Sequence, residues 1–370
     1  MKLSDRYKIY NDQPIGDQFH HYLNASDIDF SFIHEFETTP VLDRILHQAN
    51  GKKILLVLTF KTIEKIIQEK SKFNDLKTLI EDKKIKLVIY QLDTVYDLSR
   101  ECMGDKNWPV ATDFLKTVES TVWCDGYVSK EIARRYPLTE FIQHFHYPWI
   151  SVGTDPQAFS LSKTDTEKTN TFLNVMNSRR PHRQQLIRAM EDKPFLQDAV
   201  IKHNYGMMGG AHKCSDLNEC GYGSIWLNGK DFKNHIPNLD WYAKTYFELL
   251  AESSFFDDDS FDFTEKITKP IIMEHPFIVL ANKHFLKNLR SLGFKTFGEY
   301  IDESYDECIK FEDKIPIIIK NLERLDLSTS KKFYNDTKEI RQFNRRHLLY
   351  LQGKHISDKW AKFRDYLDNV

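Results

Sequence analysis

The sequence has few of the residues that mark specialised protein classes. Only 5 of its 370 residues are cysteine, an odd and scattered set that excludes a disulfide framework and fits a reducing compartment. The 14 glycines and 12 prolines are too few for a low-complexity or disordered chain. Positive charge is not in excess either, because the net charge is -2. A global electrostatic field for nucleic-acid binding is therefore absent, and only a local patch could serve that purpose.

Long hydrophobic runs are also missing. No stretch approaches the roughly 20 apolar residues that span a bilayer. The amino-terminal run MKLSDRYKIYNDQPIG lacks the apolar core of a signal peptide. We therefore expect a cytoplasmic protein without a membrane span.

What the sequence does contain is an alternation of strand and helix patterns over a length that favours two domains. Residues 54–58 form a continuous apolar run, typical of a strand that is buried on both faces of a parallel sheet. Helical spacing follows over 61–70 and 75–80, and a second strand is predicted over 85–90. A further strand is predicted over 122–128, after which Ser129 caps a helix that Pro137 ends. This alternation indicates a doubly wound sheet.

The second half repeats the pattern after a break. The segment 151–170 is polar and rich in Ser and Thr, and we interpret it as a linker. A strand (171–176), a helix (181–190) and a strand (199–202) follow, and amphipathic helices are predicted near the carboxyl terminus over 331–351 and 356–367. We predict an α/β fold with four parts: an acceptor-side domain (1–150), the linker (151–170), a nucleotide-sugar-binding domain (171–327) and terminal helices (328–370).

The stretch with the most chemical content is 241–306. It predicts a strand over 246–250 that ends at Ala251 and Glu252, a helix over 265–273 capped by Thr264, and a strand over 276–280. The amino end of a helix offers unpaired N–H groups and a positive dipole end, both suited to a diphosphate. Lys266 lies in the first turn, where its ammonium could reach the same phosphates. The carboxylate of Glu265 could accept hydrogen bonds from two ribose hydroxyls.

Simpler explanations exist for the same residues. Glu265 and Lys269 have the commonest spacing for an ion pair on a helix surface, and many capped helices bind nothing. Glu252 is equally well explained as a second carboxylate of a donor site or as a solvated strand end.

The run FDFTEKITKPIIMEHPFIVLANKHFLKNLRSLGFKTFGEYIDESYD resembles a family of glycosyltransferases found in bacteria, phages and other large DNA viruses. The upstream piece FLNVMNSRRPHR (172–183) resembles a strand and basic turn of the same family. The TEK element at 264–266 is also similar to the donor-site signature of the α1,3-fucosyltransferases, which have the GT-B fold of two facing Rossmann-like domains. The resemblance covers roughly residues 171–310 and implies a nucleotide-diphosphate sugar as co-substrate, with no other cofactor. If the protein is viral, its compartment would be the host cytoplasm.

Carried over residue by residue, the resemblance implies that Glu265 holds the ribose and Lys266 the pyrophosphate. Arg183 would be a second phosphate ligand, a role that suits its planar, permanently charged fork. We add Glu252, Thr264 and Lys269 to this predicted donor site. One departure concerns Asp262, which stands where the fucosyltransferases usually have an aromatic residue. This departure puts base stacking in doubt and argues against assuming a guanine nucleotide or fucose.

Inverting transfer also needs a general base that deprotonates the acceptor hydroxyl. Asp93 and Glu35 are the candidates, because each follows a strand or strand-like segment of the first half. A loop carboxylate that faces water explains either residue as well. Lys266, Arg183 and the helix end supply positive charge for the leaving diphosphate, so we predict a metal-independent reaction, with retaining chemistry left open.

Three further signals are weaker. Asp257, Asp258 and Asp259 resemble a metal-binding D-x-D motif but are better read as a solvated acidic loop. A mobile loop explains His203, His212, Cys214 and Cys220 better than a zinc site, because their spacing matches no standard zinc motif.

The third signal is the basic segment 341–347, which could contact nucleic-acid phosphates, but an amphipathic helix with a solvated face explains it as well. The favoured partners are therefore a nucleotide sugar and a glycan or other hydroxyl acceptor. The alternatives are sugar transfer to a hydroxymethylated base in DNA, and a binding protein with the same fold that has lost catalysis.

Overall fold

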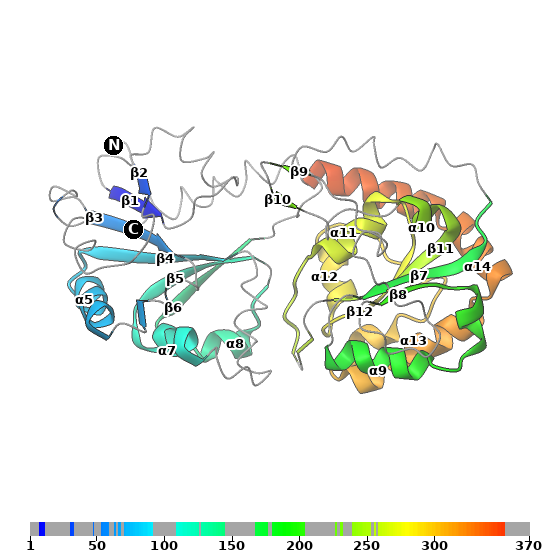
Figure 1. Ribbon diagram of the computed structural model, residues 1–370, viewed down its shortest axis with the longest axis horizontal. Helices are drawn as coiled ribbons and strands as arrows, with labels where there is room; N and C mark the ends of the chain where they lie inside the picture. Colours follow the sequence, from blue (N-terminus) through cyan, green and yellow to red (C-terminus); the bar gives the residue numbers. More distant parts are fainter. Residues whose placement is uncertain are drawn as a thin grey trace. The chain divides into compact units, whose positions relative to one another are not determined.

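A computed structural model of the chain divides into two compact units, Met1–His146 with Lys354–Val370, and Tyr147–Gly353. The residues that the structure describes are 7–11, 30–32, 47, 53–58, 63, 66–67, 70–91, 109–125, 127–144, 167–176, 180–203, 226–227, 230–231, 239–252, 255–256 and 258–351. Each unit has its own sheet (Figure 1).

Unit 1 is built on a parallel sheet with the strand order β2-β1-β3-β4-β5-β6. The strands are β1 (Tyr7–Asn11), β2 (Phe30–Phe32), β3 (Lys53–Leu58), β4 (Ile85–Gln91), β5 (Ser120–Asp125) and β6 (Thr139–His144). Helices α5 (Lys70–Glu81), α7 (Pro109–Thr117) and α8 (Lys130–Arg134) lie on one face of this sheet (Figure 1). The order 2-1-3-4-5 is one of the two common arrangements of doubly wound folds.

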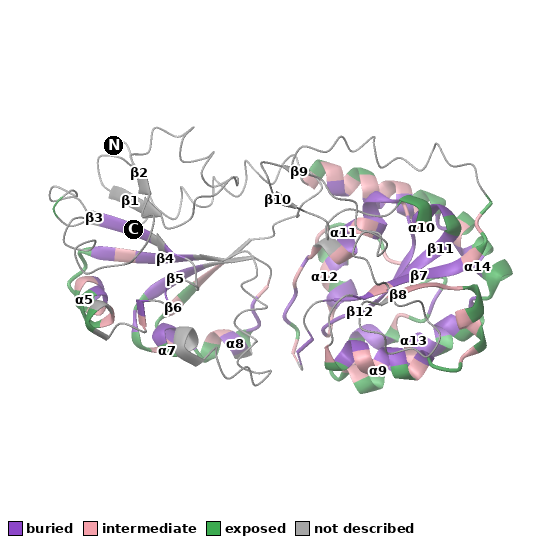
Figure 2. Cartoon of the chain, viewed as in Figure 1, coloured by how far each residue is buried: buried purple, intermediate pink, exposed green. Residues whose placement is uncertain are grey.

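The sequence of unit 1 explains its core. The strands β3 and β4 are apolar over most of their length, and Leu55, Leu56 and Val88 are fully buried (Figure 2). The helical positions Ile63 and Ile66 are buried as well, which agrees with the predicted helical spacing. The predicted cap of α8 is confirmed, because the Ser129 hydroxyl accepts the N–H of Ile132 at 3.2 Å.

Unit 2 contains a four-stranded parallel sheet with the order β12-β11-β7-β8. Its strands are β7 (Asn170–Met176), β8 (Val200–His203), β11 (Thr245–Ala251) and β12 (Phe277–Leu280). A short antiparallel pair, β9 (Trp226–Leu227) and β10 (Lys230–Asp231), is separate from this sheet. In chain order the sheet reads 2-1-3-4, so its strand order changes direction between β7 and β11.

The helices of unit 2 cover both faces of the sheet. They are α9 (Pro181–Met190), η3 (Pro194–Asp198), α10 (Leu239–Lys244), α11 (Glu265–Ile272), α12 (Phe285–Ser291), η5 (Ser304–Glu307), α13 (Phe311–Arg324) and α14 (Leu327–Asp336), and residues 338–351 are helical too. Figure 1 shows α9 and α13 on one face and α10, α11 and 338–351 on the other. Every residue of β11 is buried, so this strand is the centre of the unit (Figure 2).

A cluster of aromatic rings joins the helices to the strands of unit 2. Phe247 of β11 stacks on Phe172 of β7 with 5.5 Å between ring centroids, and it meets Phe333 of α14 edge-on at 6.0 Å. Gly293 follows the end of α12 at a φ of +91°, where an added Cβ would come within 2.7 Å of the His347 ring, so this position favours glycine.

The α/β class is confirmed, with parallel sheets in both units. The predicted helix 181–190 coincides with α9. The ends of the other strands and of the helix predicted over 171–280 differ from the observed ends by no more than one residue. Among the described residues, no helix has the length and apolar character that crossing a membrane requires. The predicted linker lies outside the described residues as far as 166, and β7 begins at its last residue, Asn170.

Candidate functional site

The candidate site lies at the carboxyl ends of β7 and β11 in unit 2. Open α/β sheets bind ligands at the point where the strand order reverses, beyond the carboxyl ends of the strands. Here that point falls between β7 and β11, because β8 lies beside β7 and β12 lies beside β11. The next helix after β7 is α9, and the next after β11 is α11, and the two cover opposite faces of the sheet (Figure 1). The topology and the sequence motif therefore indicate the same place.

The amino end of α11 is capped as the sequence predicts. Thr264 has extended backbone angles, and its hydroxyl accepts the N–H of Lys266 at 3.1 Å. The carbonyl of Thr264 accepts the Thr268 hydroxyl at 2.9 Å. Below this first turn, Ile267 and Ile271 are buried against the sheet, so α11 is fixed along its length. Lys266 is half-buried in the first turn, whereas the side chain of Glu265 lies outside the described residues.

A buried carboxylate ties this cap to the end of β11. Glu252 is 3% exposed, and its Oε2 accepts the Thr264 hydroxyl at 2.6 Å. The Thr264 hydroxyl therefore donates to Glu252 while it accepts from Lys266, which joins strand end and helix start in one hydrogen-bonded chain. A solvated strand end is thus excluded for Glu252. Its proposed contact with a donor sugar stays a prediction.

The first turn of α9 holds the same strand end from the other face of the sheet. One Arg183 nitrogen, Nη2, donates to the carbonyls of Ala251 at 2.9 Å and Glu252 at 2.8 Å. His182 donates to the Glu252 carbonyl at 3.0 Å, and both side chains are 3% exposed. Burial is the main reason that the pKa of His182 is lowered to about 3, so its ring is neutral at physiological pH and donates through Nε2. These two residues therefore bind the end of β11 to the first turn of α9.

The sequence analysis predicted that Arg183 binds a phosphate, and it did not consider His182. In the structure the guanidinium of Arg183 donates to two backbone carbonyls, 68 and 69 residues later in the chain. No local signal marks such a partner. Contact between Arg183 and phosphate remains a prediction that these bonds do not test.

Lys269 lies further along α11, and a second buried carboxylate, Glu248, lies on β11. Glu248 is 4% exposed and accepts the Tyr242 hydroxyl at 2.5 Å. Burial raises the pKa of Glu248 to about 7, although the charge of Lys269 and the hydrogen bond from Tyr242 act in the opposite direction. Lys269 therefore lies close enough to compensate the charge of Glu248, a role that its predicted place in a donor site did not include. Glu248 was not singled out from the sequence, where it is one more residue of a strand.

The residues around Asp262 belong to the core. Phe261 is fully buried against Phe285, with 5.0 Å between ring centroids, and Phe263 stacks on Phe294 at 5.6 Å. Neither ring is therefore available to stack on a nucleotide base while this packing persists. Asp262 itself is half-buried between them. The sequence therefore departs from the fucosyltransferase pattern at Asp262, and core packing occupies the rings on either side of this residue.

The DESYD run (302–306) has a structural role. Asp306 is 3% exposed and accepts the N–H groups of Leu286 and Lys287 at the start of α12, at 2.9 and 3.0 Å. Glu303 accepts the N–H of Phe297 at 2.7 Å. Both carboxylates thus fix backbone within unit 2.

Most of the other predicted residues fall outside the part of the chain that the structure describes. Asp93 and Glu35 lie outside the described residues, as do Asp257, His212, Cys214, Cys220 and the side chain of His203. The Asp258 carboxylate accepts the N–H of Ser260 at 2.8 Å, and Asp259 is exposed. Within the described ranges no group of three or more His, Cys, Asp or Glu side chains has the geometry to hold a metal ion.

The basic segment 341–347 is largely committed to the fold. Arg341 is 5% exposed and donates to the carbonyls of Glu274 at 2.6 Å and Tyr334 at 2.8 Å. Arg345 forms an ion pair with Glu274 at 3.0 Å. Of the three arginines only Arg346 is classed as exposed. The segment therefore offers little charge for a DNA phosphate.

Comparison of the chain with protein families and with curated proteins finds no match in either set.

Proposed function

We propose that this chain is a GT-B glycosyltransferase that transfers a sugar from a nucleotide-diphosphate sugar to a hydroxyl group of a glycan or similar acceptor. The observation that carries the proposal is the hydrogen-bonded chain from Glu252 through Thr264 to the Lys266 N–H. It holds a capped helix start, in a TEK sequence, at the switch point of a parallel sheet. That combination is suited to a nucleoside diphosphate.

The proposed reaction breaks the bond between the anomeric carbon and the diphosphate oxygen, and it forms a bond to the acceptor oxygen. Negative charge develops on the departing diphosphate, where the α11 dipole and the Lys266 ammonium would stabilise it. The acceptor proton passes to a carboxylate base, for which Asp93 and Glu35 stay the candidates. Inversion at the anomeric carbon is the outcome of one such displacement.

The donor half of the proposal is tested by thermal unfolding of the full chain with nucleoside diphosphates and their sugars. A ligand at a hundred times its Kd stabilises the native state by about 2.7 kcal/mol, which raises Tm by about 5–10 °C for a unit of this size. We expect one nucleotide to do so, and we expect Lys266→Ala to lose most of the shift. Lys320→Ala, an exposed lysine of α13, is the matched control and should keep it.

Turnover is measured separately, as release of the nucleoside diphosphate from the sugar nucleotide that binds. Binding with release that depends on a hydroxyl acceptor supports the transferase. Binding without release under any acceptor supports a binding protein that has lost catalysis. If no nucleotide raises Tm in either variant, the proposed donor site is wrong.

A further inference from the structure

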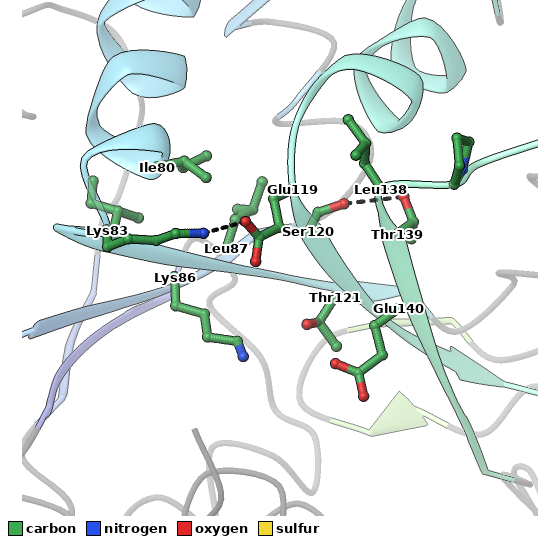
Figure 3. Close-up of a pocket in the computed structure, with 12 residues that line it drawn as sticks. Ile80, Lys83, Lys86, Leu87, Glu119, Ser120, Thr121, Leu138, Thr139 and Glu140 are labelled. Carbon is green, nitrogen blue, oxygen red and sulfur yellow. Dashed lines mark hydrogen bonds and ion pairs between the residues drawn. The ribbon is translucent and has the colours of Figure 1, made fainter.

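Two lysines of this molecule differ in the groups that surround their charge. In unit 1, Lys83 pairs with Glu119 beside a cavity of about 560 Å³, which is the usual arrangement of an ammonium and a carboxylate (Figure 3). In unit 2, Lys168 shares an aromatic ring with another cation. Its Nζ lies 4.8 Å from the ring centroid of Tyr334, and the guanidinium carbon of Arg341 lies 3.7 Å from the same centroid. The Lys168 charge therefore has a like charge as its neighbour.

The Lys168 side chain is held at the end of α10. Its Nζ donates to the Tyr242 carbonyl at 2.6 Å and to the Ala243 carbonyl at 3.3 Å. The backbone of Lys168 is fixed as well, because its carbonyl accepts the Tyr246 hydroxyl at 3.1 Å. The residue is half-buried, so it has a defined position without being enclosed in the core.

This environment favours the neutral amine of Lys168 over the ammonium. Burial, with a contribution from the charge of Arg341, lowers the pKa of Lys168 from 10.5 to about 7. At a pH of about 7.5 a lysine with an ordinary pKa is neutral in about one molecule in a thousand, whereas Lys168 is neutral in more than half. Backbone carbonyls accept a hydrogen bond from an amine as well as from an ammonium, so the bonds to α10 persist. Desolvation beside a second cation is a known way to make a lysine nucleophilic.

The neighbouring charges favour a product that is an anion. Arg341 is 5% exposed, and its bonds to two backbone carbonyls leave its positive charge in place. The charge of Lys168 also reaches His275, which is neutral because burial holds its pKa well below 6.5. A negative group on Lys168 would thus replace two like charges by a pair of opposite charges.

The carboxylates of the adjoining segments are bound to other side chains. Glu167 pairs with Lys331 of α14 at 3.4 Å, and the Glu274 carboxylate pairs with Arg345 at 3.0 Å. Both carboxylates are therefore engaged with other cations.

We propose that Lys168 binds carbon dioxide reversibly as a carbamate. The lone pair of Nζ attacks the carbon of CO2 and forms an N–C bond. One C=O bond passes its π electrons to oxygen, and the nitrogen releases one proton to solvent. The carbamate keeps one N–H, which can still donate to the Tyr242 carbonyl.

The change of charge selects carbon dioxide among electrophiles that react with amines. An aldehyde would give an imine, which is neutral or positive, and an acyl donor would give a neutral amide. Only the carbamate is an anion that the buried guanidinium of Arg341 stabilises. CO2 is also small and uncharged, as access to a half-buried amine requires. The inference goes beyond the proposed glycosyl transfer and does not depend on it.

The test is carbon-13 NMR of the full chain with labelled bicarbonate in a sealed tube. We expect a carbamate resonance that Lys168→Arg loses, because a guanidinium keeps the positive charge and its bonds to α10 but is never neutral at this pH. Lys331→Arg makes the same change at an exposed neighbouring lysine and should retain the resonance. Lys266→Ala should retain it too, so the result does not depend on the nucleotide site.

Chemical trapping locates the carbamate in the wild type and so does not depend on the folding of a variant. A trialkyloxonium salt converts a carbamate into a stable urethane, which peptide mass spectrometry then assigns to a residue. A urethane on Lys168 supports the inference. The inference is overturned if Lys168 carries no urethane, or if the wild type and Lys168→Arg show the same carbamate resonances.

Discussion

At the scale of single residues, Glu248 is a titratable group in the core of unit 2. Its carboxyl group is buried between the Tyr242 hydroxyl and the charge of Lys269. Burial raises its pKa from 4.5 to about 7, so the folded protein retains a proton that the unfolded chain has already released. Stability therefore falls as the pH rises from about 4.5 to about 7, by up to about 3 kcal/mol, and the loss is complete above that window.

The substitution Glu248→Gln should remove this dependence, because an amide oxygen still accepts the Tyr242 hydroxyl but does not titrate. Urea unfolding at pH 5 and at pH 8 should show the variant gaining stability over the wild type at the higher pH. Glu323→Gln, which changes a half-exposed carboxylate that pairs with Lys193 at 2.7 Å, is the control. Parallel pH curves for wild type and Glu248→Gln would contradict the assignment.

Residues also show where sequence reasoning reaches its limit. The cap at Thr264 was predictable, because it depends on residues two positions apart. The bonds from Arg183 to the end of β11 and from Thr264 to Glu252 were not, because their partners are brought together only by the sheet. The burial of Glu252 likewise follows from its neighbours in space, so the sequence left its environment open.

At the scale of elements, the candidate site depends on how α11 begins. Thr264→Val keeps the shape of the side chain but removes the hydroxyl that links Glu252 to the Lys266 N–H. A lost cap of this kind costs about 1 kcal/mol or more, and the buried carboxylate loses a partner as well. We expect nucleotide affinity, measured by titration calorimetry, to fall about tenfold.

Thr264→Ser retains the hydroxyl and should bind nearly as the wild type does. Glu248→Gln alters the same strand and helix away from the cap, and it should leave nucleotide affinity unchanged. If all three variants bind alike, the cap does not contribute to the site.

The start of α12 offers a second test of the same principle without any ligand. The Asp306 carboxylate accepts hydrogen bonds from two N–H groups there, and Asp306→Ala would leave both N–H groups without this acceptor. We expect a loss of about 1–2 kcal/mol, seen as a fall in Tm of about 2–8 °C. Asp302→Ala removes an exposed carboxylate that accepts the Ser304 N–H and hydroxyl, and it should cost about half a kcal/mol or less. Equal losses in the two variants would count against the cap.

Some strands are easier to recognise from the sequence than others. The strands β3 and β12 are short apolar runs, because both faces are covered, and such runs stand out in a sequence. The strands β1 and β6 are mixed in polarity and were not predicted. Of the three-residue β2, the sequence indicated only a strand-like segment before Glu35. Strands of that kind are recognisable only from the neighbours with which they pair.

At the scale of the whole molecule, the two units have separate sheets and separate cores. Leu56 in β3 and Leu249 in β11 are both fully buried, and truncation of such a leucine typically costs about 2–5 kcal/mol. Because contacts within a unit carry that cost, we expect Leu56→Ala to weaken unit 1 and Leu249→Ala to weaken unit 2. Hydrogen exchange followed by mass spectrometry should show faster exchange in peptides of the altered unit and little change in the other.

The same measurement with a bound nucleotide joins this division to the proposed function. A ligand at the α11 site raises the free energy of unfolding of unit 2 alone. It should therefore slow hydrogen exchange in β7, β11 and α11 and leave exchange in β3 and β4 unchanged. In the Leu249→Ala variant it should restore part of the lost protection, whereas in Leu56→Ala it should not. Protection of β3 and β4 by the nucleotide in the wild type would mean that the donor site draws on unit 1 as well, and the assignment to unit 2 alone would then be wrong.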